Sequence, residues 1–413
     1  MFMQIHMLQS VPPGNLNRDD SGQPKKCLFG GVTRGRISSQ CLKRNIRRSQ
    51  QFKEAFGEEL AVRTKYLPSL VADAIKAIPG NDIPEKEIEA IKTGLASRFK
   101  KEEKSKNVGE EPENTGEETT GTDMTPQLVF FRPAFANKIA NLVSQIRRDN
   151  PIAYKALTGA KAKKEDEKAA KAGMDKFTRE AFEAKESLSI DVAMFGRMTT
   201  SEIVADVEAS CQVAHALSTH ETLIESDYFT AMDDERDRYA KTKTSGAAFL
   251  GSGDTETFFN SAVYYKYLNL DTSGFLENLK ESDFAKAAKA AATLVEAAAL
   301  ATPTGKQNAF AAHSVPELIM VELSAKKQPI SYANAFLQPV QAADLMAASA
   351  GALSDYCASV AAAFSPSDTK RFFLAVGLAK DFRLPLEAKR LETLAQLASA
   401  VETALKAAHS GAK

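Results

Sequence analysis

The sequence predicts an α+β fold, because strand-like and helix-like patterns both occur along the chain. Met3, Ile5 and Met7 recur at every second position, which is the period of a strand. Residues 258–270 and 318–323 alternate in the same way. A further strand is predicted at 372–378, and alanine-rich helices are predicted at 282–301, 341–364 and 386–408.

Length and charge limit the class of protein. With 413 residues, the chain has room for two or three domains, or for one domain with large insertions. The 53 basic and 53 acidic residues give a formal net charge of zero, which excludes a wholly basic protein such as a histone. A local basic patch would still be enough to bind nucleic acid.

Neither a membrane span nor a metal cluster is expected. The longest apolar candidate, Ala290 to Ala301, is mostly alanine and contains Glu296. The first ten residues lack the basic start and the apolar stretch of a signal peptide. The scattered cysteines indicate reduced thiols in the cytoplasm, with no metal or other cofactor. They are Cys27, Cys41, Cys211 and Cys357.

A basic helix is predicted to begin at Ser38 or Ser39, since either hydroxyl can accept a hydrogen bond from a free backbone N–H group. Leu42 and Ile46 lie one turn apart and can face a core. The rest of the helix surface carries like charges four residues apart, a spacing that destabilises a helix slightly. An anionic partner could compensate for this repulsion. These charges belong to Lys43, Arg44, Arg47 and Arg48.

Positive charge is concentrated between Leu16 and Gln51. Nine basic residues there oppose two acidic ones, a local net charge of +7. The glycine-rich turn from Phe29 to Arg36 and the following helix start add backbone N–H groups, an arrangement that suits phosphate binding. The turn lacks the GxGxxG and GK[ST] patterns of nucleotide-binding loops. A solvated basic face is the alternative interpretation.

Three other segments have distinctive compositions. Residues 10–37 are rich in Pro, Gly, Asn and Asp and predict a long irregular loop. Residues 100–123 contain almost no apolar side chain and predict a disordered loop. Residues 203–217 predict a helix capped near Thr200 or Ser201.

No convincing catalytic group emerges. Asp19 and Asp20 could hold a divalent ion or activate a ribose hydroxyl for RNA cleavage. We favour the alternative that they bond local N–H groups or pair with Arg18, because one adjacent carboxylate pair makes a poor metal site. His215 and His220 are five residues apart and do not share a helix face.

A series of motifs runs in order through roughly residues 1–340. The first comprises Leu16-Asn17-Arg18-Asp19-Asp20, Phe29-Gly30-Gly31 and the run from Arg34 to Arg44. Later members are Gly196-Arg197-Met198 with Thr200-Ser201, Ala214-His215-Ala216 with Thr219-His220, Phe229-Thr230-Ala231 with Asp233-Asp234, Gly305-Lys306-Gln307 and the run from Ser331 to Phe336. Together they resemble the CasC family, the CRISPR RNA-binding backbone subunit of the type I-E Cascade surveillance complex.

The resemblance implies a fold shaped like a right hand. An RRM-like (ferredoxin-like) palm would carry a large helical insertion, the fingers, and a β-hairpin thumb. The palm would comprise residues 1–52, 187–218 and 258–413, the last part including the alanine-rich helices. The fingers would span 53–186, with the loop 100–123, and the thumb 219–257. No aromatic RNP motif is present, so base stacking on the sheet is not expected.

The resemblance also implies a role and its residues. Copies would polymerise along the guide spacer, together with other Cascade subunits, and present the guide bases for pairing with target DNA in antiviral defence. No membrane partner is implied. Met198 would be an apolar wedge or a stacking partner for a base, or equally a residue packed in the core. The implied RNA contacts are Arg18, Arg34, Arg36, Ser39, Gln40, Lys43, Arg44, Arg47, Arg197, Met198 and Lys306.

The expected protein is therefore not an enzyme. Two competing hypotheses stay open. One is a metal-dependent ribonuclease that uses Asp19 or Asp20 in the loop after the first strand. The other is a purely structural scaffold whose basic charge is incidental and whose assembly needs no RNA.

Overall fold

The computed structural model divides into two compact units. Unit 1 comprises residues 1–52, 212–272 and 284–413, and unit 2 comprises residues 53–211 and 273–283. The structure describes every residue except 107–123, 126–127, 160–163, 183–187, 199–203, 229–230, 233–246, 249–255, 365, 367 and 411–413. Each unit contains a hydrophobic cluster of its own.

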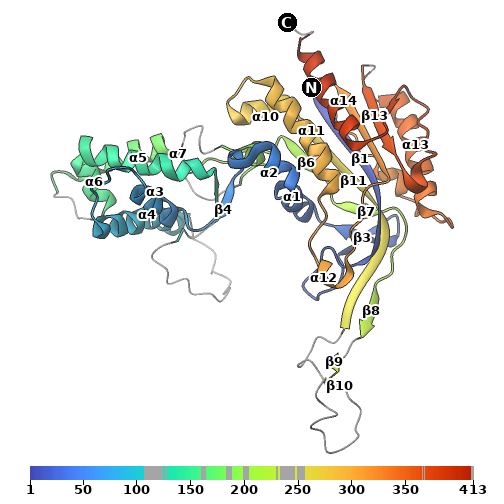
Figure 1. Cartoon of the computed structure of the whole chain (residues 1–413), viewed down its shortest axis with the longest axis horizontal. Coiled ribbons are helices and arrows are strands. Elements are labelled where there is room, and N and C mark those ends of the chain that lie inside the picture. Colours follow the sequence, from blue (N-terminus) through green and yellow to red (C-terminus); the bar gives the residue numbers. More distant parts are fainter. Residues whose placement is uncertain are drawn as a thin grey trace, which may run out of the picture. The chain divides into compact units, whose positions relative to one another are not determined.

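Unit 1 is built on a ten-stranded sheet (Figure 1). Its strands are β1 (Phe2–Gly14), β2 (Lys26–Phe29), β3 (Val32–Ile37), β6 (Cys211–Val213), β7 (Ala216–Ser218), β8 (Glu225–Tyr228), β11 (Glu256–Asp271), β12 (Leu318–Ser324), β13 (Lys370–Ala375) and β14 (Lys389–Arg390). The order is β14-β13-β12-β1-β11-β7-β3-β2, and β6 and β8 also pair with β11. The long antiparallel pair of β1 with β11 lies at the centre of the sheet.

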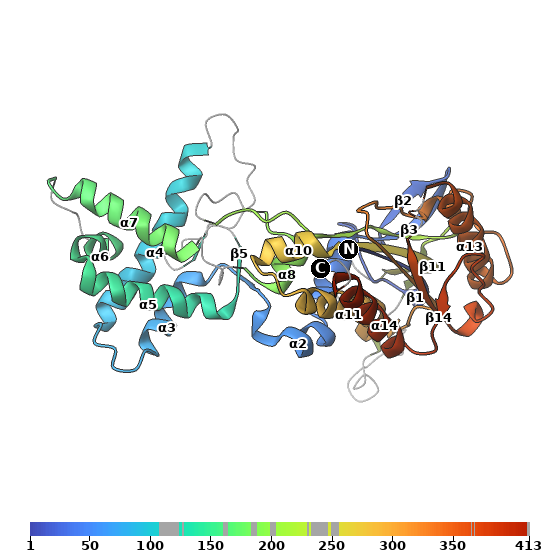
Figure 2. The same cartoon turned by 90° about the horizontal axis from the view of Figure 1, so that it is seen from above.

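Helices cover both faces of this sheet (Figures 1 and 2). The helices of unit 1 are α1 (Ser39–Arg47), α11 (Phe284–Leu300), α12 (Gln307–Phe310), α13 (Leu345–Phe364) and α14 (Leu394–Ser410), with short 3-10 turns η3 (Ala333–Phe336) and η4 (Gly377–Ala379). α11 and α14 pack side by side on one face, and α13 packs on the other. Both faces of the central strands are therefore buried.

Successive side chains of β1 point to opposite faces of the sheet, and both faces are buried. Met3, Ile5 and Met7 are fully buried on one side of β1. Leu8 points to the opposite side, in one cluster with Leu353 of α13. Each such side chain contributes about 1.5–3 kcal/mol when it is fully removed from water. The predicted strand is confirmed, and so are the strands predicted at 258–270 and 318–323.

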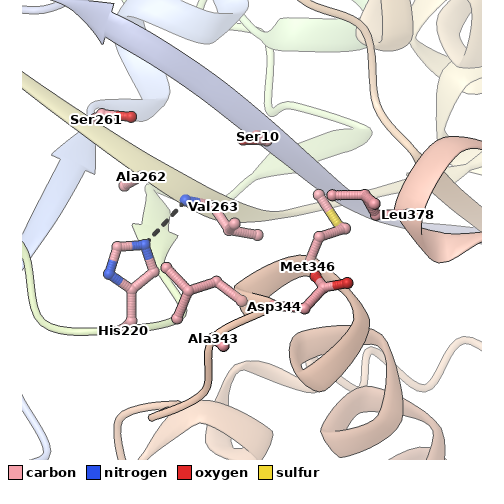
Figure 3. A pocket seen from close by; sticks show the side chains of 10 residues that line it. Ser10, His220, Ser261, Ala262, Val263, Ala343, Asp344, Met346 and Leu378 are labelled. Carbon is pink, nitrogen blue, oxygen red and sulfur yellow. Dashed lines mark hydrogen bonds between the residues drawn. The ribbon is translucent and has the colours of Figure 1, made fainter.

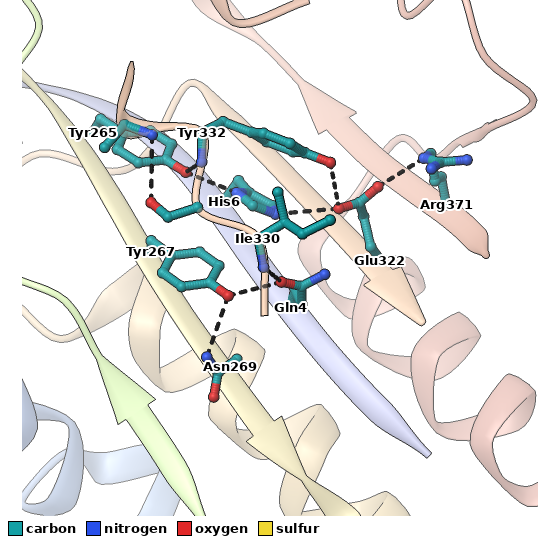
Figure 4. Close-up of polar contacts among 11 residues, drawn as sticks. Gln4, His6, Tyr265, Tyr267, Asn269, Glu322, Ile330, Tyr332 and Arg371 are labelled. Atoms are coloured by element: carbon teal, nitrogen blue, oxygen red, sulfur yellow. Dashed lines mark hydrogen bonds and ion pairs between the residues drawn. The ribbon is translucent and has the colours of Figure 1, made fainter. Parts of the chain in front are cut away.

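A buried polar network lies on the α13 side of the sheet (Figure 4). Glu322 accepts hydrogen bonds from Tyr332 Oη at 2.9 Å and from Arg371 Nε at 2.7 Å, and it lies 3.4 Å from His6 Nε2. The other ring nitrogen of His6 is 2.8 Å from Tyr265 Oη. Burial alone would raise the pKa of Glu322, but His6, Arg371 and Tyr332 together hold it below its usual range. The buried carboxylate is thus paired.

The segment 10–37 is more regular than the sequence predicts. Instead of one long loop it forms the hairpin of β2 and β3, in which Phe29 pairs with Val32. The two residues between them, Gly30 and Gly31, have φ of 62° and 81°, which suits a tight two-residue hairpin turn. The strands of this hairpin carry the basic residues Lys26, Arg34 and Arg36, so the sequence shows no alternation of apolar side chains that would predict them.

The helix predicted at 203–217 is wrong for the residues that the structure describes there. Residues 211–213 and 216–218 are the strands β6 and β7. β7 pairs with β11 through Leu217 and Tyr265, and Ala214 N donates to Tyr267 O at 2.9 Å. Pairing with the long central strand overrides the local helical propensity of this segment. The predicted cap, Thr200 or Ser201, lies outside the described residues.

Unit 2 is mainly helical. Its helices are α3 (Leu67–Lys76), α4 (Glu85–Lys106), α5 (Pro133–Asp149), α6 (Pro151–Leu157), α7 (Glu167–Phe182), α8 (Ile190–Phe195) and most of α10 (Thr272–Leu279), with the 3-10 turn η1 (Gly57–Glu59) and the strands β4 (Val62–Thr64) and β5 (Val129–Phe131). α2 (Gln50–Phe56) spans the boundary at Lys53. α4 continues to Lys106, so the loop predicted at 100–123 begins too early, and residues 107–123 lie outside the described part.

The segment predicted as the thumb is described in part. β8 pairs antiparallel with the start of β11, where Tyr228 lies opposite Glu256. Beyond it, the strands β9 (Ala231–Met232) and β10 (Ala247–Ala248) pair with each other. The rest of the segment lies outside the described residues, and the boundaries 219–257 stay a prediction. Among the described helices, none has the length and apolar character needed to cross a membrane.

Candidate nucleic-acid interface

The basic helix begins where the sequence places it. α1 spans Ser39–Arg47, and Ser38 is its N-cap, whose Oγ accepts a hydrogen bond from Cys41 N at 3.3 Å. Leu42 and Ile46 are buried, and α1 packs beside α11. The basic side chains are left on the outer surface of the helix. The prediction of a capped, amphipathic helix is confirmed.

The loop before the hairpin is fastened to the start of α1. Asn17 Oδ1 accepts a hydrogen bond from Ser38 N at 2.8 Å, and the Asn17 carbonyl accepts one from Lys25 N at 2.8 Å. Arg36 N in turn donates to Lys25 O at 2.8 Å. Arg18, next to Asn17, is thereby held close to the first turn of α1. Several chain segments thus bring their cations to one surface.

We call this surface the basic cluster. Arg18, Lys26, Arg44 and Arg48 are exposed, and Lys25, Arg36, Lys43 and Arg47 are half-buried. With Arg47 set aside, these side chains form no ion pair with a carboxylate of the described chain. The Nε atom of Arg36 is buried and lacks a hydrogen-bond acceptor there. Cations without intramolecular partners are available to an anionic ligand.

Lys306 lies near the loop that carries Arg18, in the same unit as the basic cluster. The adjoining Gly305 lies so close to the segment before Arg18 that an added Cβ atom would be 2.5 Å from Leu16 O and 2.6 Å from Asn15 O. Lys306 is exposed, and its φ of 51° lies in the left-handed region. The close backbone contact explains the glycine of the Gly305-Lys306-Gln307 motif.

Arg34 has a different environment from the other predicted contacts. None of its surface is exposed. Its guanidinium donates to the carbonyls of Phe29 at 3.2 Å, Ser218 at 3.1 Å and Phe336 at 2.7 Å. Burial also lowers the pKa of Arg34. The enclosed guanidinium of Arg34 is therefore poorly placed for a direct RNA contact. Its hydrogen bonds instead connect the β2–β3 hairpin to β7 and η3.

Arg197 and Met198 belong to unit 2. Arg197 is buried, and its guanidinium donates to Ala205 O at 3.0 Å and to Phe130 O at 3.0 Å. Burial lowers the pKa of Arg197 to about 10. Because the guanidinium is buried and bonded to carbonyls, Arg197 is poorly placed for the predicted RNA contact. Met198, by contrast, is 91% exposed, which excludes the core-packing alternative and leaves the apolar-wedge interpretation.

The first backbone N–H groups of α1 are mostly used within the protein. Cys41 N donates to the Ser38 cap, and Ser39 N donates to His215 Nδ1 at 3.2 Å. Gln40 is exposed, and its side-chain Oε1 accepts a hydrogen bond from Ser39 Oγ at 3.4 Å. The expected phosphate contact through helix N–H groups is thus restricted, and side chains must supply most of the donors.

His215 is a member of this surface that the sequence reasoning left out of the site. It lies between β6 and β7, is exposed, and contacts the first turn of α1. Burial, followed by the nearby charges of Arg36 and Lys25, lowers its pKa. The motif Ala214-His215-Ala216 was the available signal, but the predicted helix at 203–217 placed it on the wrong element.

The carboxylates of the loop are engaged locally. Asp19 Oδ1 accepts hydrogen bonds from Ser21 Oγ at 2.8 Å, Ser21 N at 3.0 Å and Gln23 N at 3.0 Å. The Ser21 hydroxyl is the main cause of the lowered pKa of Asp19. Asp20 is exposed. No set of three or more His, Cys, Asp or Glu side chains suited to a metal ion occurs among the described residues.

His220 lines a shallow hollow of about 270 Å³ next to Asp344 and Met346 (Figure 3). Its Nε2 accepts a hydrogen bond from Val263 N at 3.2 Å, and its Nδ1 donates to Glu221 O at 2.7 Å. Burial lowers the pKa of His220, in keeping with a neutral ring. His220 thus ties the loop after β7 to β11, and both of its ring nitrogens are already engaged in hydrogen bonds.

The comparisons with known proteins agree with this architecture. A family model for CT1975-like proteins (Cas_CT1975) matches residues 3–401, nearly the whole chain. The chain belongs to the CT1975-like protein family. No curated protein matches it.

Two solved structures contain chains similar to this CT1975-like protein. One, named "CRISPR RNA-guided surveillance complex, pre-nicking", aligns with a TM-score of 0.74 and 24% identity over 98% of this chain and 100% of that chain. The other, named "CRISPR RNA-guided surveillance complex", aligns with a TM-score of 0.67 and 22% identity over 98% and 100% of the two chains. The CT1975-like protein therefore has the mixed α/β fold of these subunits.

Proposed function

We propose that this CT1975-like protein is a Cascade-type subunit that holds CRISPR RNA through the phosphate groups of the RNA backbone. The observation that carries the proposal is the basic cluster, which α1, β3 and the loop before β2 assemble on one surface of unit 1. With Arg47 set aside, its cations form no ion pair with a carboxylate of the described chain. The shared fold with surveillance-complex chains and the family membership support the same role.

The finer features of the proposal follow the CasC resemblance. Copies of the chain would line up along the guide, together with other Cascade subunits, each using an RRM-like palm, helical fingers and a thumb. The guide bases would stay available for pairing with target DNA. Recognition through charge accepts any guide sequence, and base pairing then supplies the specificity. Assignment to the type I-E group belongs to this proposal.

We also propose that the chain does not cleave RNA. Asp19 uses Oδ1 to order its own loop through three hydrogen bonds, and Asp20 belongs to no set of three or more metal-ligating side chains among the described residues. A metal-dependent nuclease needs carboxylate oxygens directed at an ion. The expected outcome is that labelled RNA stays intact after incubation with the protein and Mg²⁺. Cleavage that disappears in Asp19→Ala or Asp20→Ala would contradict the proposal.

The function is tested by a native gel of the purified chain with labelled single-stranded RNAs of increasing length. We expect a ladder that gains bands as the RNA lengthens, because each further stretch of backbone accepts a further copy. The bands should weaken steeply with salt, by about 0.7 units of log K per log[salt] for each phosphate contacted.

Other gel patterns would contradict specific parts of the proposal. One fixed band at every RNA length would indicate a discrete site and argue against side-by-side assembly. Assembly that forms without RNA and survives nuclease treatment would support a pure scaffold. Absence of any shift, with both free guide and guide carrying the remaining subunits, would remove the RNA-binding role itself.

A further inference from the structure

His215 lies next to members of the basic cluster, although it is not a cation at neutral pH. Three groups face it: the backbone N–H of Ser39 from α1, Arg36 from β3 and Lys25 from the segment before β2. Only the first is a hydrogen bond, from Ser39 N to Nδ1 at 3.2 Å. Burial and then the two cations disfavour the imidazolium form, so the pKa of His215 lies below its ordinary value of 6.5.

This hydrogen bond decides which ring nitrogen carries the proton. A backbone N–H can donate only to a nitrogen that has a free lone pair, so Nδ1 is unprotonated. In the neutral ring the hydrogen must then be on Nε2, which makes Nε2 a donor. The side chain is exposed, and no group of the described chain accepts from Nε2.

A second unpaired donor belongs to the same neighbourhood. Arg36 Nε is buried and has no acceptor in the described chain. Unpaired buried donors are rare and costly in native proteins, because the protein has lost their hydration without replacing it. Arg36 as a whole is half-buried, so a phosphate group bound by the accessible part of its side chain would lie beside the free donor of His215.

We propose that His215 is a further RNA-contacting residue, which donates its Nε2–H to a phosphate oxygen of the strand bound beside Arg36. This inference rests on the proposed RNA-binding function. The contact is a neutral one at physiological pH and releases no counterion. Its role is to direct the strand across the first turn of α1, where Ser39 N fixes the orientation of the ring.

Two substitutions separate this contact from the support that His215 gives to α1. In His215→Asn, the amide oxygen can still accept from Ser39 N, but the donor at the Nε2 position is lost. In His215→Gln, the longer side chain places an N–H donor near the Nε2 position. We expect His215→Asn to bind single-stranded RNA about fivefold more weakly at about pH 8, as for one lost hydrogen bond, and His215→Gln to bind nearly as well as the wild type.

The salt dependence reports the charge of His215 in the complex. Near pH 8 the slope of log K against log[salt] should be the same in wild type and His215→Asn, since a neutral donor releases no ion. Below the pKa of His215 the imidazolium adds a charge, so wild-type affinity should rise as the pH falls through that lowered pKa, with a slope steeper by about 0.7. His215→Asn and His215→Gln should lack this rise.

The outcomes are distinct. If the wild type binds RNA and both variants match it, the role of His215 is overturned while the RNA-binding function stands. If both variants lose affinity equally, or His215→Asn lowers the slope near pH 8, the neutral contact is overturned. If the wild type does not bind RNA, the proposed function fails, and this inference fails with it.

Discussion

Reversing the charge of Lys43 and Arg44 together is expected to weaken binding to single-stranded RNA by about 100-fold or more while the protein stays folded. Both residues lie on the surface of α1, Arg44 exposed and Lys43 half-buried, and neither has a carboxylate partner within the described chain. The change removes two cations and adds two repulsive charges next to the phosphates. Fluorescence anisotropy over a series of salt concentrations measures both the affinity and its slope.

The salt slope gives this prediction a second readout. Two phosphate contacts on a single strand account for about 1.4 units of log–log slope, so the double variant Lys43→Glu, Arg44→Glu should have a slope shallower by about that amount. Its thermal unfolding should match the wild type, because neither side chain contributes to the buried face of α1.

A matched control carries the same change of charge at the other edge of the sheet. Lys380 follows η4 and Lys389 lies in β14, the strand farthest from β2 in the sheet order, and both are exposed. Lys380→Glu with Lys389→Glu should leave affinity and slope close to those of the wild type. Equal losses in both double variants would mean that RNA responds only to net charge, and the basic cluster would then be an ordinary solvated face.

The elements that the sequence predicts well are those whose burial pattern is local. The sequences of β1, β11 and β12 alternate with a period of two, because successive side chains of a central strand point to opposite faces of the sheet. α1 is predicted equally well, since its cap Ser38 and its buried residues Leu42 and Ile46 all lie within one short segment of the sequence.

The elements that the sequence predicts poorly depend on distant partners. Residues 211–218 have a helix-like composition, yet they are strands because Tyr264 and Tyr265 of β11 pair with β7. The β2–β3 hairpin is basic on its surface, so its strands carry no apolar alternation, and only the two glycines at its turn indicate it. The pairing of β7 with β11 has no such local signal.

The site shows the same division. The sequence predicts which segments carry the basic cluster, because charge clustering is visible in one dimension. It does not predict which arginines are free. Arg34 and Arg36 are two residues apart on β3, so their side chains leave the same face of the strand, but only Arg34 finds backbone carbonyls to bond. Those carbonyls come from Phe29 and from segments about 180 and 300 residues away.

Replacing Arg34 with Met is therefore expected to lower the free energy of unfolding by about 3–5 kcal/mol, because several carbonyls, with those of Ser218 and Phe336 in buried hydrogen bonds, would lose their donor at once. Met approximates the length of the arginine stem, so the change tests the lost hydrogen bonds more than a cavity. Denaturant unfolding, followed by circular dichroism, measures the loss. RNA affinity of the protein that remains folded should change little, since the Arg34 guanidinium is enclosed.

Arg36→Met is the matched control, and the two variants should behave in opposite ways. Arg36 lies two residues further along β3 with a buried Nε that has no acceptor in the described chain, so its removal should cost less than about 1 kcal/mol of stability. Its RNA affinity should fall, with a salt slope shallower by about 0.7. The reverse result would contradict this division. An Arg34→Met protein of normal stability that loses affinity and slope would mean that Arg34 contacts RNA directly, as the motif alone suggests.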